Sequence, residues 1–155
     1  MPKWVPKNLE ATVDIIAPPE RVWAVVADPK RIPEFSPQCV RMQPLGALKR
    51  GTWTVNLNRD GWKYWPTTSR IVAFEPNREF AFKVTENRST WRFTLEPTAN
   101  GTRLTQTRDV SDGTTAFSRN AINAVLGGEE SFEVKLVDGM RQTLAGIKAA
   151  VETPG

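Results

Sequence analysis

The chain has 155 residues, 25% of them charged, and a formal net charge of +4, which fits one globular domain with a sizeable core. It has no histidine and one cysteine, which excludes Ser-His-Asp and Cys-His catalytic systems, a zinc site and an internal disulfide. Its basic residues are scattered, no secretory signal is visible, and no apolar run approaches the roughly 20 residues of a membrane span. We therefore expect a cytoplasmic protein without cofactor, metal, nucleic-acid partner or membrane span.

The first part of the chain predicts one strand and two short helices. Leu9–Ile16 is rich in β-forming residues and ends before Pro18 and Pro19, which cannot continue a strand ladder but suit the first turn of a helix. Residues 20–27 then predict a short helix with an apolar inner face. A second short helix or turn is expected over Lys30–Phe35.

The middle of the chain, Cys39 to Asp109, alternates apolar and polar residues with the period of two that is typical of strands. Asp60-Gly61 and Asn100-Gly101 predict tight hairpins in which both residues have positive φ. The connections are short, so the strands should form an antiparallel meander. The expected strands are Cys39–Leu45, Thr52–Arg59, Trp62–Glu75, Glu79–Thr85, Thr90–Glu96 and Thr102–Asp109.

The last part of the chain is helical in pattern. Residues 114–126 are expected to form a helix, which Gly127-Gly128 ends. A long helix is expected over Glu129–Val151, because apolar residues recur there every three or four positions on one face: Phe132, Leu136, Met140, Leu144, Ile147 and Val151. Only the preceding strands can cover this stripe, so the expected α+β fold is a curved antiparallel sheet of about seven strands wrapped on this helix.

Short motifs along nearly the whole chain, roughly Leu9 to Val151, point to a known family. They are Ala17-Pro18-Pro19-Glu20-Arg21-Val22-Trp23 with Asp28-Pro29, Phe35-Ser36-Pro37-Gln38-Cys39, Gly51-Thr52-Trp53, Trp65-Pro66-Thr67-Thr68-Ser69-Arg70, Glu75-Pro76, Phe80-Ala81-Phe82 and Gly101-Thr102-Arg103-Leu104-Thr105. Together they resemble the START-like (SRPBCC) superfamily of Bet v 1-like, lipid-transfer and polyketide cyclase/dehydrase-like proteins, in particular its actinobacterial members. The resemblance implies a helix-grip fold as a single domain over 1–155, with a core of about 9–151 and an apolar cavity between sheet and helix.

Aromatic residues are many for this length, with six tryptophans and seven phenylalanines. Each also suits a plain core position, but together they can form the wall of a ligand cavity. The candidate ligand-contacting residues are Trp23, Phe35, Trp53, Trp65, Phe82, Trp91 and Phe93, with Leu136 and Met140 from the long helix.

Polar residues also alternate onto the expected inner face. Thr67 and Ser69 share a face with Trp65, so two hydroxyl groups should point into an apolar space. Gln106 and Arg108 share the face of the last strand that holds the apolar Leu104. An inward Arg108 needs a carboxylate or an anionic ligand, and a solvated Arg108 on a bulged strand is the alternative.

Residues 52–59 leave two strand phases open. Simple alternation, which we favour, turns Trp53, Val55 and Leu57 inward. The opposite phase, suggested by similar sequences, makes Asn56 and Asn58 line the cavity. It leaves the three apolar residues as an exposed patch suited to a protein contact, such as a homodimer.

Three functions are compatible with these features. The favoured one is a binding or carrier protein for a hydrophobic small molecule, namely a lipid, a polyketide or another aromatic or polycyclic compound, acting as a monomer or homodimer. The first alternative is a cofactor-free polyketide cyclase/dehydratase-type enzyme, in which Arg108, Tyr64, Ser69 or Thr67 would polarise carbonyl groups or move protons. The second is a protein-interaction or stress-regulatory module.

Overall fold

The computed structural model describes residues 8–86, 88–110 and 129–153. The elements in chain order are β1 (Leu9–Ile15), α1 (Pro19–Val26), the 3-10 turn η1 (Pro29–Arg31), α2 (Ile32–Phe35), β2 (Cys39–Pro44), β3 (Trp53–Asp60), β4 (Lys63–Glu75), β5 (Glu79–Val84), β6 (Thr90–Pro97), β7 (Thr102–Asp109) and α4 (Glu129–Glu152). The predicted α+β helix-grip fold is confirmed, whereas the helix expected over 114–126 and the break at Gly127-Gly128 lie outside the described residues.

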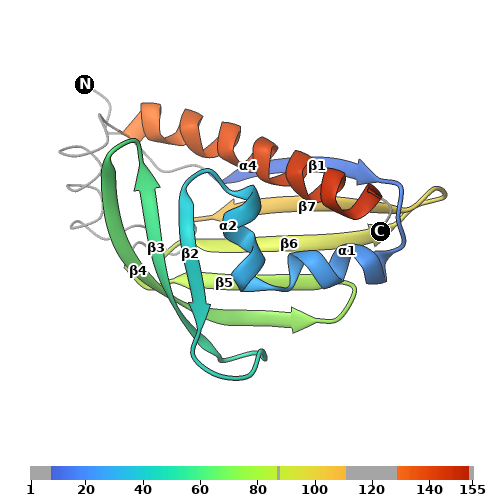
Figure 1. Ribbon diagram of the computed structural model, residues 1–155, viewed down its shortest axis with the longest axis horizontal. Coiled ribbons are helices and arrows are strands. Elements are labelled where there is room, and N and C mark those ends of the chain that lie inside the picture. The colour runs from blue at the N-terminus through green and yellow to red at the C-terminus, as the bar shows by residue number, and fades with distance from the viewer. Residues whose placement is uncertain (1–7, 87, 111–128, 154–155) are drawn as a thin grey trace.

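The seven strands form one antiparallel sheet in the order β1-β7-β6-β5-β4-β3-β2. Strands β2 to β7 are a meander, and β1 joins it at the far edge, where Leu9 lies opposite Arg108 and Ile15 opposite Thr102. Figure 1 shows α1, α2 and α4 on one face of this sheet, with β2 and β3 running across the direction of β5 to β7. The sheet is therefore strongly curved, and its concave face receives the helices.

Helix α4 carries the predicted apolar stripe. Its buried residues recur at helical spacing: Leu136, Met140, Leu144, Ile147 and Val151. The side chain of Phe132 lies outside the described part of the chain. Because these residues occupy one face, the helix can lie along β1 and against α1 and α2 while its other face meets water.

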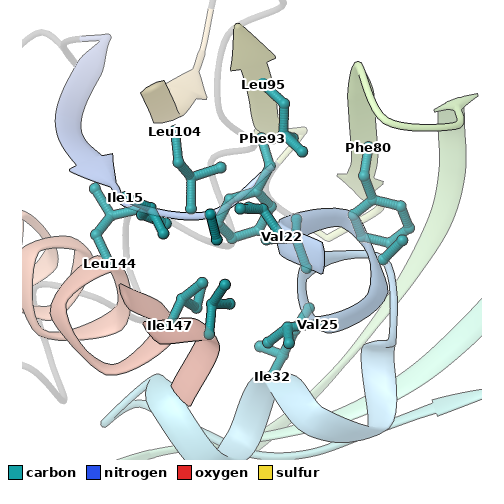
Figure 2. Close-up of a cluster of buried hydrophobic side chains, with 14 of the residues drawn as sticks. Ile15, Val22, Val25, Ile32, Phe80, Phe93, Leu95, Leu104, Leu144 and Ile147 are labelled. Atoms are coloured by element: carbon teal, nitrogen blue, oxygen red, sulfur yellow. The ribbon is translucent and has the colours of Figure 1, made fainter. Parts of the chain in front are cut away.

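The packed core fills one end of the concave face. Figure 2 shows it between the C-terminal half of α4, helices α1 and α2, and strands β1, β5, β6 and β7, with the labelled side chains Ile15, Val22, Val25, Ile32, Phe80, Phe93, Leu95, Leu104, Leu144 and Ile147. Trp23 packs edge-to-face on Phe74 and Phe80, at centroid distances of 5.3 and 6.5 Å. Leu136 and Met140, nearer the N-terminus of α4, are buried outside this cluster.

Two glycines of α4 let the segment around α2 approach closely. A Cβ atom at Gly139 would lie 3.5 Å from Cγ of Pro37, and one at Gly146 would lie 3.0 Å from Cδ1 of Phe35. Phe35 is also covered by the guanidinium group of Arg31, 5.7 Å from the ring centre. The glycine side of the helix is thus a packing surface.

The favoured phase of residues 52–59 is wrong. In β3, Thr54 and Asn56 are buried, whereas Trp53 and Val55 are each 45% exposed and Leu57 is 37% exposed. The physical reason is that the inward polar residues find hydrogen-bond partners on β4, described below, so apolar character does not decide the phase. On the outer face, Trp53 is covered by the guanidinium group of Arg70 at 5.6 Å from the ring.

The hairpin glycines have two different roles. At the β3–β4 turn only Gly61 has a positive φ, of +66°, while Asp60 still belongs to β3. Positive φ is absent at Asn100 and Gly101, so that part of the prediction is wrong. A Cβ atom at Gly101 would lie 2.1 Å from the carbonyl oxygen of Ile15, so glycine is required there for close backbone approach.

Met140 provides a test of the helix position. It is 2% exposed, so Met140→Asp places a carboxylate where no water can reach it. We expect a loss of about 3–5 kcal/mol in the free energy of unfolding, measured by urea titration. Ala145→Asp, on the exposed face of the same helix, should unfold near the wild-type midpoint. An unchanged midpoint for Met140→Asp would contradict this packing.

Candidate functional site

A cavity of about 140 Å³ lies beside the packed core, between the curved sheet and helices α2 and α4. The residues that line it are Ile32, Ser36, Gln38, Cys39, Met42, Asn56, Asn58, Trp65, Thr67, Phe82, Val84, Trp91, Phe93, Gln106, Leu136 and Thr143. Almost every element contributes, because the concave face of β2 to β7 surrounds the space. None of these described residues is an acid, an arginine or a lysine.

Aromatic rings form one wall of the cavity. Phe82 on β5 lies opposite Trp91 on β6, and Phe93 follows two residues later on the same face. The rest of the apolar lining comes from Ile32, Met42, Trp65, Val84 and Leu136. Flat rings on neighbouring strands provide a surface for stacking and edge contacts with an apolar ligand.

A cluster of uncharged polar side chains lies on β3 and β4 and reaches the cavity through Asn56, Asn58 and Thr67. Thr54 donates to Oδ1 of Asn56 at 2.9 Å and also contacts the Ser69 hydroxyl closely. Nδ2 of Asn56 donates to Oγ1 of Thr67 at 3.3 Å and to Oγ of Ser69 at 3.4 Å. Nδ2 of Asn58 donates to the same Thr67 oxygen at 2.9 Å. We call these five residues the polar cluster.

The polar cluster leaves one hydrogen-bond donor toward the cavity. The Thr67 oxygen accepts from two amide groups, which uses both of its acceptor positions. Its own O–H group has no acceptor among the described residues, and Thr67 lines the cavity. The cluster is therefore internally bonded yet still able to donate to a ligand.

Gln106 on β7 has an unsatisfied acceptor. It lies opposite Phe93, lines the cavity and is 7% exposed. Its Oε1 atom is buried and has no hydrogen-bond partner in the described part of the chain. Most buried acceptors in proteins are bonded, so this oxygen is an exception among the described residues and costs folding free energy.

Cys39, at the start of β2, adds no charge to the cavity. Burial raises the pKa of its thiol to about 11, against a smaller lowering effect of a backbone hydrogen bond at Arg41. The side chain is therefore a protonated thiol at neutral pH, neither a nucleophile nor an anion.

The structure places the predicted ligand-contacting residues in three groups. On the cavity wall lie Trp65, Thr67, Phe82, Trp91, Phe93, Gln106 and Leu136. Buried but away from the wall lie Ser69, Arg108 and Met140, while Trp23 packs in the core and Phe35 against Gly146. Trp53 lies on the outer face of the sheet, which contradicts the inward position expected for it.

Several lining residues were missed by the sequence reasoning, including Gln38, Cys39, Met42 and Thr143. Thr143 follows Leu136 by seven residues, so the helical period could have found it. Gln38 precedes β2, and Cys39 and Met42 lie on this short strand, where alternation is too brief to give a phase.

The candidate catalytic residues do not converge. Tyr64 is 57% exposed on the outer face, and Arg108 is buried without lining the cavity. Thr67 and Ser69 do lie together, joined through the amide of Asn56. The described lining thus offers hydroxyl and amide groups but no side chain that exchanges a proton readily near neutral pH.

Two further features concern metal binding and membrane insertion. The described residues contain no group of three His, Cys, Asp or Glu side chains that could hold a metal ion. No helix in the described ranges is long and apolar enough to cross a membrane.

The comparisons with known proteins agree with this geometry. A family model described as "Polyketide cyclase / dehydrase and lipid transport" matches residues 6–152. No curated protein matches the sequence. Among solved structures, a Polyketide_cyc-like protein from Corynebacterium glutamicum is similar at 28% identity and a TM-score of 0.61, over 94% of this chain and 91% of that one.

Two aromatase/cyclases have a more similar backbone and a less similar sequence. Zhui from Streptomyces sp. R1128 aligns with a TM-score of 0.75 at 19% identity, over 94% of this chain and 93% of its own. The di-domain BexL from the BE-7585A biosynthetic pathway aligns with a TM-score of 0.74 at 21% identity, over 96% of this chain and 51% of its own. At these identities the two likenesses show the fold alone.

The pH dependence of Cys39 alkylation tests whether water reaches this thiol. Only the thiolate reacts with iodoacetamide, so the alkylation rate of the folded protein should rise with pH to a midpoint near 11. The urea-unfolded chain should show the ordinary midpoint near 9. Because the unfolded state loses its proton first, stability should also fall as pH rises between these values. A folded-state midpoint at or below 9 would mean that the thiol is open to water.

Proposed function

The chain belongs to the polyketide cyclase / dehydrase and lipid transport family, and within it we propose a binding or carrier role for a hydrophobic small molecule held in the cavity. The observation that carries the proposal is the composition of the cavity wall. Eight of the sixteen described lining residues are aromatic or aliphatic, and the others, apart from the protonated Cys39, carry uncharged hydroxyl or amide groups that converge on the same space. Ligand pockets are typically built in this way.

The same wall favours binding over catalysis. A cyclase or dehydratase must take up and release protons at defined atoms of its substrate. The ionisable group on the described wall is Cys39, whose raised pKa keeps it protonated at neutral pH. The Thr67 hydroxyl and the Gln106 amide can orient a ligand, which is what a carrier requires.

The volume of the cavity limits the size of the ligand that fits it. About 140 Å³ is smaller than the roughly 300–1,000 Å³ of pockets for drug-sized molecules. A small ligand, or one part of a larger molecule, fits the space without rearrangement. Since the polar groups on the wall are uncharged, we expect an affinity in the micromolar range, about −8 kcal/mol.

Tryptophan emission provides the test. Trp65 and Trp91 line the cavity, so titration with fatty acids, flavonoids or polycyclic phenols should change the emission saturably for at least one class. Trp91→Phe should remove a large part of the change. Trp62→Phe is the matched control, since Trp62 is 82% exposed and lies away from the cavity. Gly139→Ala should bind like wild type, because that position faces Pro37. Absence of a saturable response for all three ligand classes and for single-ring compounds such as toluene, which suit about 140 Å³, would refute the carrier role.

A second proposal comes from the outer face of the sheet. Trp53, Val55 and Leu57 are exposed there, and Pro66 on β4 lies opposite Leu57. We call these four residues the outer patch. Side chains two apart on a strand lie about 7 Å apart on one face, so the three residues of β3 are contiguous. A contiguous exposed apolar strip is typical of protein-contact surfaces, and we propose that it supports a homodimer.

Sedimentation velocity tests the outer patch. The wild-type protein should show a concentration-dependent dimer that Val55→Lys abolishes, because the lysine would place a charge at the centre of the contact. Glu10→Lys, an exposed change on β1 at the opposite edge of the sheet, should leave the dimer intact. A wild-type protein that is monomeric at every concentration would contradict the homodimer.

A further inference from the structure

The burial of the lining residues on β3 and β4 shows where the cavity approaches the protein surface. Asn56 and Thr67, which lie opposite each other, are 6% and 9% exposed. One step closer to the β3–β4 turn, the opposing residues Asn58 and Trp65 also line the cavity but are only half-buried. The mouth of the cavity therefore lies on the side of this turn.

An ion pair lies beside the mouth. Asp60, the last residue of β3, shares the inner face of that strand with Asn58. Its Oδ2 atom lies 3.0 Å from Nζ of Lys135 on α4. Lys135 directly precedes Leu136, which lines the cavity from the helix side. Figure 1 shows the β3–β4 hairpin reaching the N-terminal half of α4 at this point. Each partner of the pair thus stands next to a lining residue, one on the sheet and one on the helix.

The packing of α4 leaves the contact with this hairpin to the ion pair. The helix packs mainly against β1, β7, α1 and α2, and Leu144, Ile147 and Val151 of its C-terminal half belong to the core. Among the side chains that the structure describes, Lys135 and Asp60 make the hydrogen bond that joins α4 to the β3–β4 hairpin. The two elements can therefore part at this point while the core remains packed.

The exposure of the pair suits reversible opening. The side chain of Lys135 is 49% exposed and that of Asp60 is 17% exposed. A pair that is partly in water contributes little to stability, so it can break often. Because Asp60 is largely covered, its attraction to Lys135 is screened less than that of a fully solvated pair.

We propose that the ion pair between Lys135 and Asp60 is a latch at the mouth of the cavity, which controls how fast a hydrophobic ligand enters and leaves. The inference rests on the proposed carrier function. When the pair is formed, the hairpin and the helix enclose the ligand, and when it breaks, they part beside Asn58 and Leu136. Neither partner lines the cavity, so the latch changes the rates of entry and exit together and leaves the affinity unchanged.

The exchange of 4-fluorotoluene, a neutral single-ring compound, tests the latch. Saturation transfer between its free and bound fluorine NMR signals gives both rate constants. Asp60→Asn and Lys135→Met each remove one charge and keep the approximate size of the side chain. Each should raise the association and dissociation rate constants about threefold, as expected for the loss of a partly exposed ion pair. The Kd should stay within about twofold of the wild-type value.

Two further variants separate the latch from general effects on the fold. Arg103→Met removes another exposed ion pair, with Asp14 at 3.1 Å between β7 and β1, and should leave both rate constants unchanged. Asp60→Lys combined with Lys135→Glu restores opposite charges in exchanged positions and should return both rate constants to the wild-type values. Raising the salt concentration from about 0.05 to 1 M should accelerate exchange more in the wild type than in Lys135→Met, because salt screens the pair.

The outcomes separate the latch from the carrier function. Unchanged rate constants in both single variants, or an equal acceleration in Arg103→Met, would overturn the latch and leave the carrier function standing. If only a larger ligand binds, stopped-flow tryptophan fluorescence makes the same comparison with that ligand. Absence of binding for single-ring and larger ligands alike would overturn the carrier function and the latch with it.

Discussion

The hydrogen bonds of the polar cluster determine which side of the sheet becomes the cavity. Thr54 and Asn56 bond to each other, and both are linked to Ser69 on the neighbouring strand. A slip of one residue in β3 would expose these groups without their partners and turn Trp53, Val55 and Leu57 inward. Such a slip would replace the polar wall by a tryptophan and two aliphatic side chains and would fill the space. The cavity and the outer patch are thus two consequences of one strand phase.

Close packing at the other end of the concave face leaves that space open. The C-terminal half of α4 packs against α1 and β1 through Leu144, Ile147 and Val151. Gly146 leaves room for the ring of Phe35 of α2. The same helix presents Leu136 and Thr143 to the cavity, and the Thr143 hydroxyl is already bonded to the carbonyl oxygen of Gly139 at 2.7 Å. The helix is held by the core, so a vacant cavity does not leave it without support. Ile32, Met42 and Phe93 belong both to the core and to the cavity wall, so the packed core fixes the position of part of that wall.

Element positions could be predicted from the sequence, because apolar period, proline and glycine act locally. The helix Glu129–Glu152 and the seven strands agree with the predicted bounds to within about two residues. The phase of β3 could not be predicted in this way, because hydropathy alone favours an inward Trp53. The side chains that decide the phase, Thr67 and Ser69, belong to the next strand. Nor could sequence separate Trp23 from Trp65. Trp23 lies on a predicted helix and Trp65 on a predicted strand, and either position suits a core residue or a cavity residue. Only the packing of Trp23 on Phe74 and Phe80 shows that it is a core residue.

The polar side chains around the cavity differ in how far they are hydrogen-bonded. In the polar cluster the Thr67 oxygen accepts from the amides of Asn56 and Asn58, and Asn56 also bonds Ser69, so these side chains hold one another in place without a ligand. Gln106 on β7 is the opposite case, because its Oε1 is buried and has no hydrogen-bond partner among the described residues. A buried acceptor without a partner costs free energy of folding, whereas the bonded cluster avoids that cost. The β3–β4 side of the concave face is therefore the side on which polar groups are placed without loss of stability.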